Sequence, residues 1–146
     1  MADTYKTRRT AGHAVVELSL MMPWIFFLFV GALDFGFYSY ALIATQNAAR
    51  VAALYPAQCA GTATDQATAC QQVRQELAWM PNSSSFSSGC ESAPLAVTVS
   101  ALTDAEGQPA SQVRVSSQTV QLIPIPGLVP GQTTITRTAQ LRVFGD

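Results

Sequence analysis

The chain has 146 residues and a formal net charge of −1; 49% of its residues are hydrophobic and 12% are charged. This length suits one modest domain, or a smaller domain with a membrane anchor. Because there is no basic excess, the composition argues against a protein that binds nucleic acid through its phosphates. The basic residues Lys6, Arg8 and Arg9 cluster directly before a long apolar run. This pattern predicts a membrane helix whose N-terminus lies in the cytoplasm.

The apolar run predicts a transmembrane segment at about residues 18–40. Residues 18–33 contain no charged side chain and would extend about 24 Å as a helix. Continuing the helix to Tyr40 gives more than about 30 Å, enough to cross the hydrocarbon core. Tyr38 and Tyr40 then fall at the membrane interface, where aromatic residues are enriched.

Two residues of this run are unusual for a plain anchor. Pro23 removes the amide that would bond to the carbonyl of Ser19, so we expect a kink or a loosened turn there. Glu17 places a carboxylate at the start of the run, which costs a few kcal/mol near the bilayer interior. A cleaved secretory signal is disfavoured because the apolar region is too long and lacks an A-x-A-like site. A plain signal anchor explains the hydrophobicity but leaves Glu17 without a role.

The helical pattern continues past the membrane segment as far as Pro56. Alanines recur at helical spacing there, at Ala41, Ala44, Ala48 and Ala52. A helix over residues 14–54 would measure about 60 Å, more than any bilayer. Its second half is therefore expected to stand outside the membrane or to lie along a soluble domain.

The N-terminal region resembles the class III leader of type IV pilins and pseudopilins. A basic leader of residues 1–12 ends in Gly12, and a cut before His13 makes Glu17 the fifth residue of the mature chain. The resemblance implies cleavage by a prepilin peptidase at the cytoplasmic face, with residues 13–55 retained as a long helix. It also implies that Glu17 of one subunit neutralises the new α-ammonium of another, since two charges that are costly in lipid become tolerable as a pair.

Further motifs are similar to those of TadE-like proteins: a Val-Glu-Leu tripeptide at Glu17, a proline in the apolar helix, an acidic-aromatic-glycine triplet beginning at Asp34, and an Asn-Ala-Ala-Arg segment ending at Arg50. This resemblance implies a minor pseudopilin of the tight-adherence (Tad, Flp-type) pilus or a related secretion assembly. The implied location is the bacterial inner membrane, and the implied partners are other pilin or pseudopilin subunits and the Tad machinery. For Asp34 two interpretations stay open: an interfacial residue, or a contact with Arg50 of a neighbouring subunit.

Residues 56–146 predict a small periplasmic α+β domain. Asp65 is placed to cap a short amphipathic helix that ends before Pro81, and the segment NSSSFSSG predicts a polar loop. Three alternating segments follow, LAVTVSAL, SQVRVSSQTVQLI and TTITRTAQLRVF, with a hairpin turn at DAEGQPA and a stiff, apolar loop at PIPGLVP. One helix packed on a roughly three-stranded antiparallel sheet is therefore expected.

Three cysteines, Cys59, Cys70 and Cys90, lie beyond the apolar run. In an oxidising compartment they predict one disulfide and one free thiol, and we favour a bond that involves Cys70, with its partner left open. His13 is the single histidine, and no cluster has metal-ligand spacing, so no metal, cofactor or catalytic site is predicted. The rival to a pseudopilin is a signal-anchored periplasmic scaffold or binding domain that does not polymerise.

Overall fold

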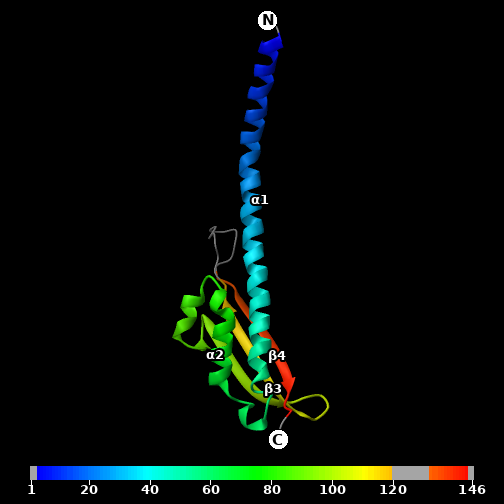
Figure 1. Cartoon of the computed structure of the whole chain (residues 1–146), viewed down its shortest axis with the longest axis vertical. Helices are drawn as coiled ribbons and strands as arrows, with labels where there is room; N and C mark the ends of the chain where they lie inside the picture. The colour runs from blue at the N-terminus through cyan, green and yellow to red at the C-terminus, as the bar shows by residue number, and fades with distance from the viewer. Residues whose placement is uncertain (1–2, 120–131, 145–146) are drawn as a thin grey trace. The chain divides into compact units, whose positions relative to one another are not determined.

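The computed structural model describes residues 3–119 and 132–144. A long helix, α1 (Asp3–Leu54), begins the chain and is followed by a small α+β domain (Figure 1). The chain divides into two compact units, Met1–Gly36 and Phe37–Asp146, so that α1 contributes to both. At 52 residues, α1 measures about 78 Å. Its end before Pro56 agrees with the sequence, but it begins at Asp3, earlier than the expected residue 14.

The first unit is a single helix that exposes its large hydrophobic side chains. Leu20, Trp24 and Leu28 are among the most exposed of these. Helix α1 continues without interruption through Pro23, and the kink expected at that residue remains a prediction. Since a chain in water rarely leaves so many large apolar side chains uncovered, this surface is suited to lipid or to other helices.

The second unit contains a four-stranded antiparallel sheet in the order β1-β2-β3-β4. The strands are β1 (Glu91–Ser92), β2 (Leu95–Thr103), β3 (Pro109–Gln118) and β4 (Thr134–Arg142). The expected α+β class is confirmed, and the three long strands match the three alternating segments. The sequence predicted about three strands and the sheet has four. The additional strand, β1, was missed because it has only two residues and shows no alternation. The PIPGLVP segment lies outside the described residues.

The β2–β3 hairpin turns where the sequence predicts. Asp104 accepts hydrogen bonds from the amides of Glu106 and Gln108 through Oδ1. Gly107 adopts φ +80°, a conformation that glycine reaches without a steric penalty. The turn is therefore held by an aspartate side chain and permitted by a glycine.

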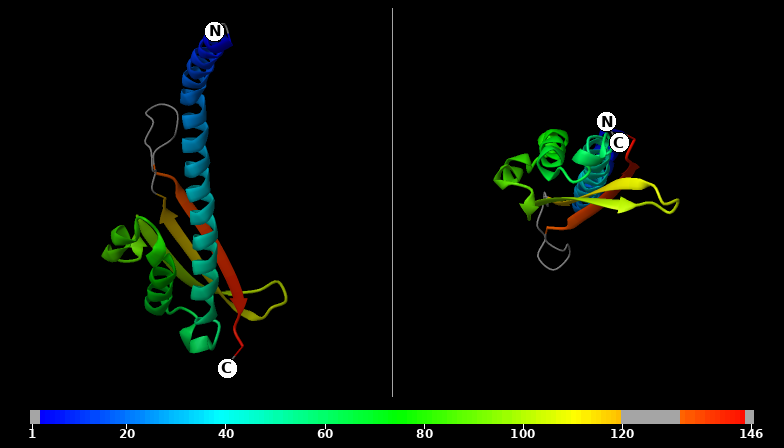
Figure 2. Two further views of the ribbon diagram at one scale, coloured as in Figure 1. Left: turned by 45° about the horizontal axis from the view of Figure 1, so that its top comes forward. Right: turned by 90° about the horizontal axis from the view of Figure 1, so that it is seen from below.

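The core of this unit lies between the sheet and the two helices, α1 and α2 (Gln66–Glu76), which cover the same sheet face (Figure 2). Residues 37–54 of α1 present small side chains to the sheet, and Ala48 and Ala52 are fully buried. Opposite them the sheet offers Val97, Val113 and Val115. Small residues allow the helix to approach the sheet closely, which explains the alanine repeat noted in the sequence.

A buried hydrogen bond adds to this packing. Thr45 Oγ1 of α1 lies 2.9 Å from Ser117 Oγ of β3. The Thr45 hydroxyl is also 2.8 Å from the carbonyl of Ala41, to which it donates. Both residues are fully buried, and the bond to Thr45 spares the Ser117 hydroxyl the cost of an unsatisfied polar group.

Helix α2 begins as expected at Asp65, whose Oδ1 accepts a hydrogen bond from the amide of Thr68. After it come two short 3-10 helices, η2 (Leu77–Trp79) and η3 (Ser83–Ser88). The second of these replaces the polar loop that NSSSFSSG predicts. Phe86 is buried in the core and anchors the turn, so this prediction was wrong. A disulfide joins Cys70 to Cys90, and Cys59 is free.

Candidate assembly site

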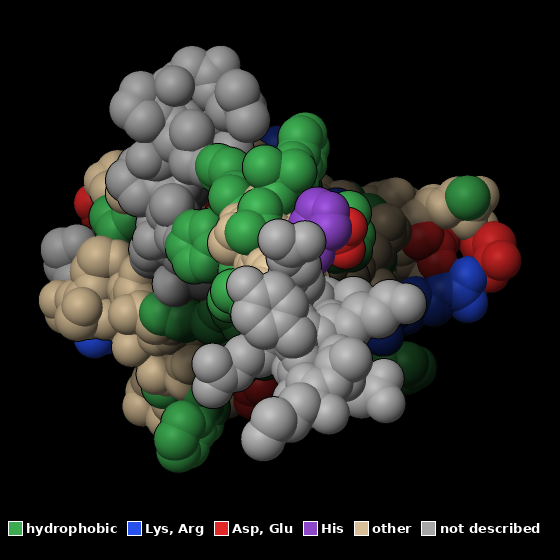
Figure 3. Space-filling model, turned by 90° about the horizontal axis from the view of Figure 1, so that it is seen from above, with side chains coloured by type: hydrophobic (Ala, Val, Ile, Leu, Met, Phe, Trp, Pro, Cys, Tyr) green, Lys and Arg blue, Asp and Glu red, His purple; other side chains and the backbone are tan. Residues whose placement is uncertain are grey.

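The first group of candidate residues lies along the N-terminal part of α1. His13 and Glu17 are separated by one helical turn and so lie on the same face of the helix. Both are exposed. The purple histidine side chain, the single histidine of the sequence, is visible at the surface in the view from above (Figure 3). The positions are compatible with a charged pair formed with another molecule.

Gly12 lies inside α1 and has no packing reason to be glycine. A Cβ atom added there would meet no atom within 4 Å. Glycine inside a helix costs about 0.5–1 kcal/mol relative to alanine. The described residues therefore give Gly12 no packing role, and the same is true of Gly31 and Gly36 in the same helix.

Glu17, Asp34 and Arg50 share an absence of charged partners. Among the side chains that the structure describes, those of residues 12–119 except 60 and 88 and of residues 132–144, the ion pairs are those of Arg142 with Asp104 and Glu106. No hydrogen bond of the Glu17, Asp34 or Arg50 side chain occurs in the same described ranges. Among the described side chains, these three charges are therefore unpaired.

Arg50 borders a hollow of about 380 Å³ between α1 and β4. The opposite side is formed by Arg137, which lies on the helix-covered face of the sheet because it pairs in register with the buried Val115. Gln46 and Asn47 add two amide side chains to the same hollow. Two guanidinium groups with amide donors beside them are suited to bind a carboxylate.

Arg137 was not among the residues selected from the sequence. The alternation of β4 places it in phase with Ile135 and Leu141, so a charged residue at an inward position was the available signal. Its proximity to Arg50 depends on how α1 lies on the sheet, and no sequence pattern specifies that.

The described residues contain no group of three or more His, Cys, Asp or Glu side chains that could hold a metal ion. The free thiol of Cys59 lies 3.3 Å from Thr62 Oγ1. Hydrogen bonding to the Thr62 side chain, and then to its amide, lowers the pKa of the Cys59 thiol.

Among the described residues, one helix, spanning Gly12–Leu54, is long and apolar enough to cross a membrane. The same stretch, residues 12–54, matches the family model of TadE-like proteins. No curated protein and no solved structure shows significant similarity to the chain. The TadE-like family is a structural, pilus-associated family, and a single apolar N-terminal helix fits a single-pass membrane protein. The resemblance seen in the sequence is thus confirmed over residues 12–54, the part of the chain that matches the TadE-like family model.

Proposed function

We propose that this protein is a minor pseudopilin that enters a Tad-type pilus, or its membrane base, through α1. The leader of residues 1–12 is removed after Gly12, and the soluble unit stands in the periplasm. The observation that carries the proposal is Glu17: an exposed carboxylate at the start of an apolar, TadE-like helix, with no charged partner in the described parts of its own chain.

Cleavage before His13 supplies the partner that Glu17 lacks. The new α-ammonium is a cation at the same end of the helix, and a carboxylate from a neighbouring helix neutralises it. Each charge alone is costly in lipid, whereas the pair is stabilised because the low dielectric strengthens its attraction. The pairing also fixes how far one helix slides along the next.

Asp34 supplies a second contact, with the hollow formed by Arg50 and Arg137 of another subunit. Asp34 and Arg50 are sixteen residues apart, about 24 Å along the helix, whereas residue 13 and Glu17 are about 6 Å apart. One parallel neighbour cannot satisfy both offsets at once. The two contacts therefore involve two different neighbours, as in a helical array of subunits.

The first test replaces Glu17 by alanine in the native host. The variant is expected to insert into the membrane normally and to lower pilus output strongly, because the lost group serves pairing between subunits. Glu91→Ala is the matched control, since Glu91 is an exposed acid without an ion pair in the described residues of the second unit. Normal pilus output from Glu17→Ala would overturn the pairing and favour a signal-anchored scaffold.

Processing and the second contact are tested in the same host. A leucine side chain at position 12 meets open space, so a block in processing by Gly12→Leu would not reflect misfolding. The intact mass of this variant should then still include the leader.

For the second contact, Asp34→Arg and Arg50→Asp should each lower pilus output, and their combination should restore part of it. A double variant no better than either single one would refute the contact.

A further inference from the structure

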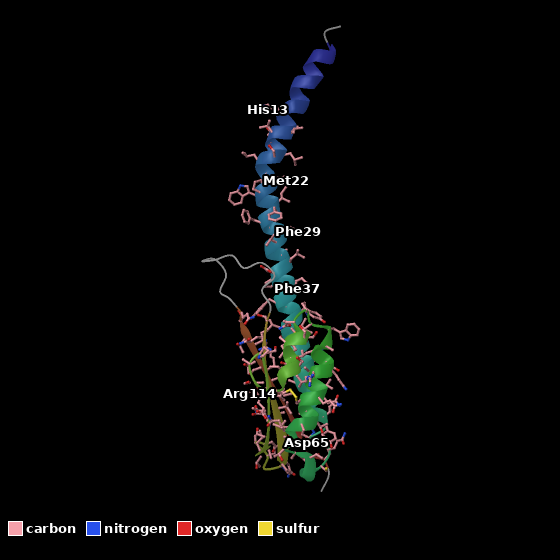
Figure 4. The ribbon with its side chains drawn as sticks, turned by 90° about the vertical axis from the view of Figure 1, so that its left-hand side faces the viewer. His13, Met22, Phe29, Phe37, Asp65 and Arg114 are labelled. Carbon is pink, nitrogen blue, oxygen red and sulfur yellow. A yellow bond between two sulfur atoms is a disulfide. The ribbon has the colours of Figure 1, made fainter. Side chains whose placement is uncertain are left out.

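The end of the second unit at which α1 enters it carries an exposed tryptophan. Phe37, Tyr40 and Ala41 of α1 line a small cavity together with Met80 and Pro81. Trp79 directly precedes Met80, so its backbone is held at this end. Figure 4 shows Phe37 and Asp65 at opposite ends of the unit, and α2 runs from Asp65 toward Trp79.

Trp79 is 86% exposed, whereas its neighbour Met80 is buried. Tryptophan is usually well buried in soluble domains, so this exposure calls for a partner. Residues 77–90 contain no charged side chain, so moving this segment out of bulk water carries no cost of desolvating a charge. Phe37, Tyr38 and Tyr40 are also partly exposed. These four aromatic residues, Phe37, Tyr38, Tyr40 and Trp79, are called the aromatic end below.

The length of the apolar run indicates which partner lies next to the aromatic end. Counting about 20 residues for a bilayer from Leu18, the first residue of the uncharged run, places the far edge of the hydrocarbon core at about Phe37. The aromatic end is therefore continuous with the membrane-spanning part of the same helix. Tryptophan and tyrosine prefer the headgroup region, because their rings are apolar and their polar groups can still bond to water.

We propose that Trp79 inserts into the headgroup region of the membrane and is a second contact of this protein with lipid, outside α1. With α1, this contact gives the soluble unit two points of attachment to the bilayer surface. The inference rests on the membrane-spanning assignment of α1 and not on its role as a pseudopilin.

The chain contains two tryptophans, Trp24 and Trp79, which allows a direct test. The full chain is placed in nanodiscs of phosphatidylcholine, with or without lipid brominated near the headgroup. In Trp24→Phe, Trp79 is the sole reporter, and bromolipid is expected to quench it severalfold more than a reporter in water. The control is Trp24→Phe, Trp79→Phe, Phe144→Trp: Phe144 is 84% exposed, and its amide bonds to Ala57 beyond the C-terminus of α1.

Three outcomes are distinguishable. Quenching of Trp79 by bromolipid, with acrylamide quenching below that of the position 144 reporter, supports the proposal. Protection from acrylamide without bromolipid quenching would indicate a protein contact and would overturn it, as would quenching by acrylamide equal to the control. In Trp79→Phe, Trp24 must be quenched by deeply brominated lipid; if it is not, the membrane assignment fails rather than the Trp79 contact alone.

Discussion

The two halves of α1 differ in what surrounds their side chains. Residues 12–36 carry bulky apolar side chains, almost all exposed, and their charges have no partner in the described residues. Residues 37–54 turn alanines and Thr45 toward the sheet and bury them completely or nearly so. One helix thus contains a segment that its own chain leaves exposed and a segment that packs within the chain.

This contrast shows that side-chain size along the helix differs with the surroundings that each segment suits. Large side chains suit lipid, or helices of other subunits, because dispersion contacts and apolar solvation grow with area. Small side chains suit a sheet that lies close against the helix. Hydrophobicity alone does not separate the two segments, since both are apolar. Side-chain size and helical phase together distinguish the two segments.

A leucine-to-alanine substitution should destabilise the fold in one region and leave its stability unchanged in the other. Leu77, the first residue of η2, is 0% exposed, so Leu77→Ala should lower the free energy of unfolding of the second unit by about 2–5 kcal/mol. Leu20 is 77% exposed in the first unit, and Leu20→Ala should leave that free energy unchanged. Thermal and urea unfolding of the full chain in detergent, followed by near-ultraviolet circular dichroism, measures both. Equal effects would mean that the two units are not independent.

Much of the fold could be predicted because its signals are local. The apolar run, the alanine repeat and Pro56 define α1 to its end, and Asp65 marks the start of α2. The three long strands follow from alternation. The short β1 could not be predicted, because it exists only by pairing with β2. The 3-10 turn at Ser83–Ser88 was missed because its stability comes from Phe86 packing in the core.

The candidate site was predictable only in part. Glu17 and Arg50 stand out because charges are rare in this helix and because the TadE-like motifs contain them. Arg137 could be identified as a candidate only from the structure, in which it pairs with Val115 and lines the hollow together with residues of α1. A site formed by two elements far apart in the sequence depends on tertiary packing, which single-sequence patterns do not encode.

A smaller effect is expected at the polar contact between α1 and the sheet. Thr45→Val leaves the buried Ser117 hydroxyl without its partner, at a cost of about 1–3 kcal/mol. Adding Ser117→Ala removes the orphaned group, so the double variant should be no less stable than Thr45→Val alone. The same unfolding measurements apply. A double variant much less stable than the single one would show that Ser117 is not left unsatisfied by Thr45→Val.

The smallest expected effect concerns pH and the β2–β3 turn. Hydrogen bonds from the Gln108 amide, then from Glu106 and Arg142, lower the pKa of Asp104 below its ordinary value of 3.8. Because the folded state binds this proton less readily than the unfolded chain, the contribution of Asp104 is present above pH 3.8 and is lost as the pH falls through the lowered pKa. The melting temperature of the second unit should therefore fall between pH 5 and pH 3 by less in Asp104→Asn than in the wild type. Hydrogen bonds from Thr68 also lower the pKa of Asp65, so Asp65 should contribute separately to the dependence of the melting temperature on pH. The double variant Asp65→Asn, Asp104→Asn should therefore show a weaker pH dependence than Asp104→Asn alone. An unchanged slope in Asp104→Asn would mean that the turn carboxylate does not couple folding to protons.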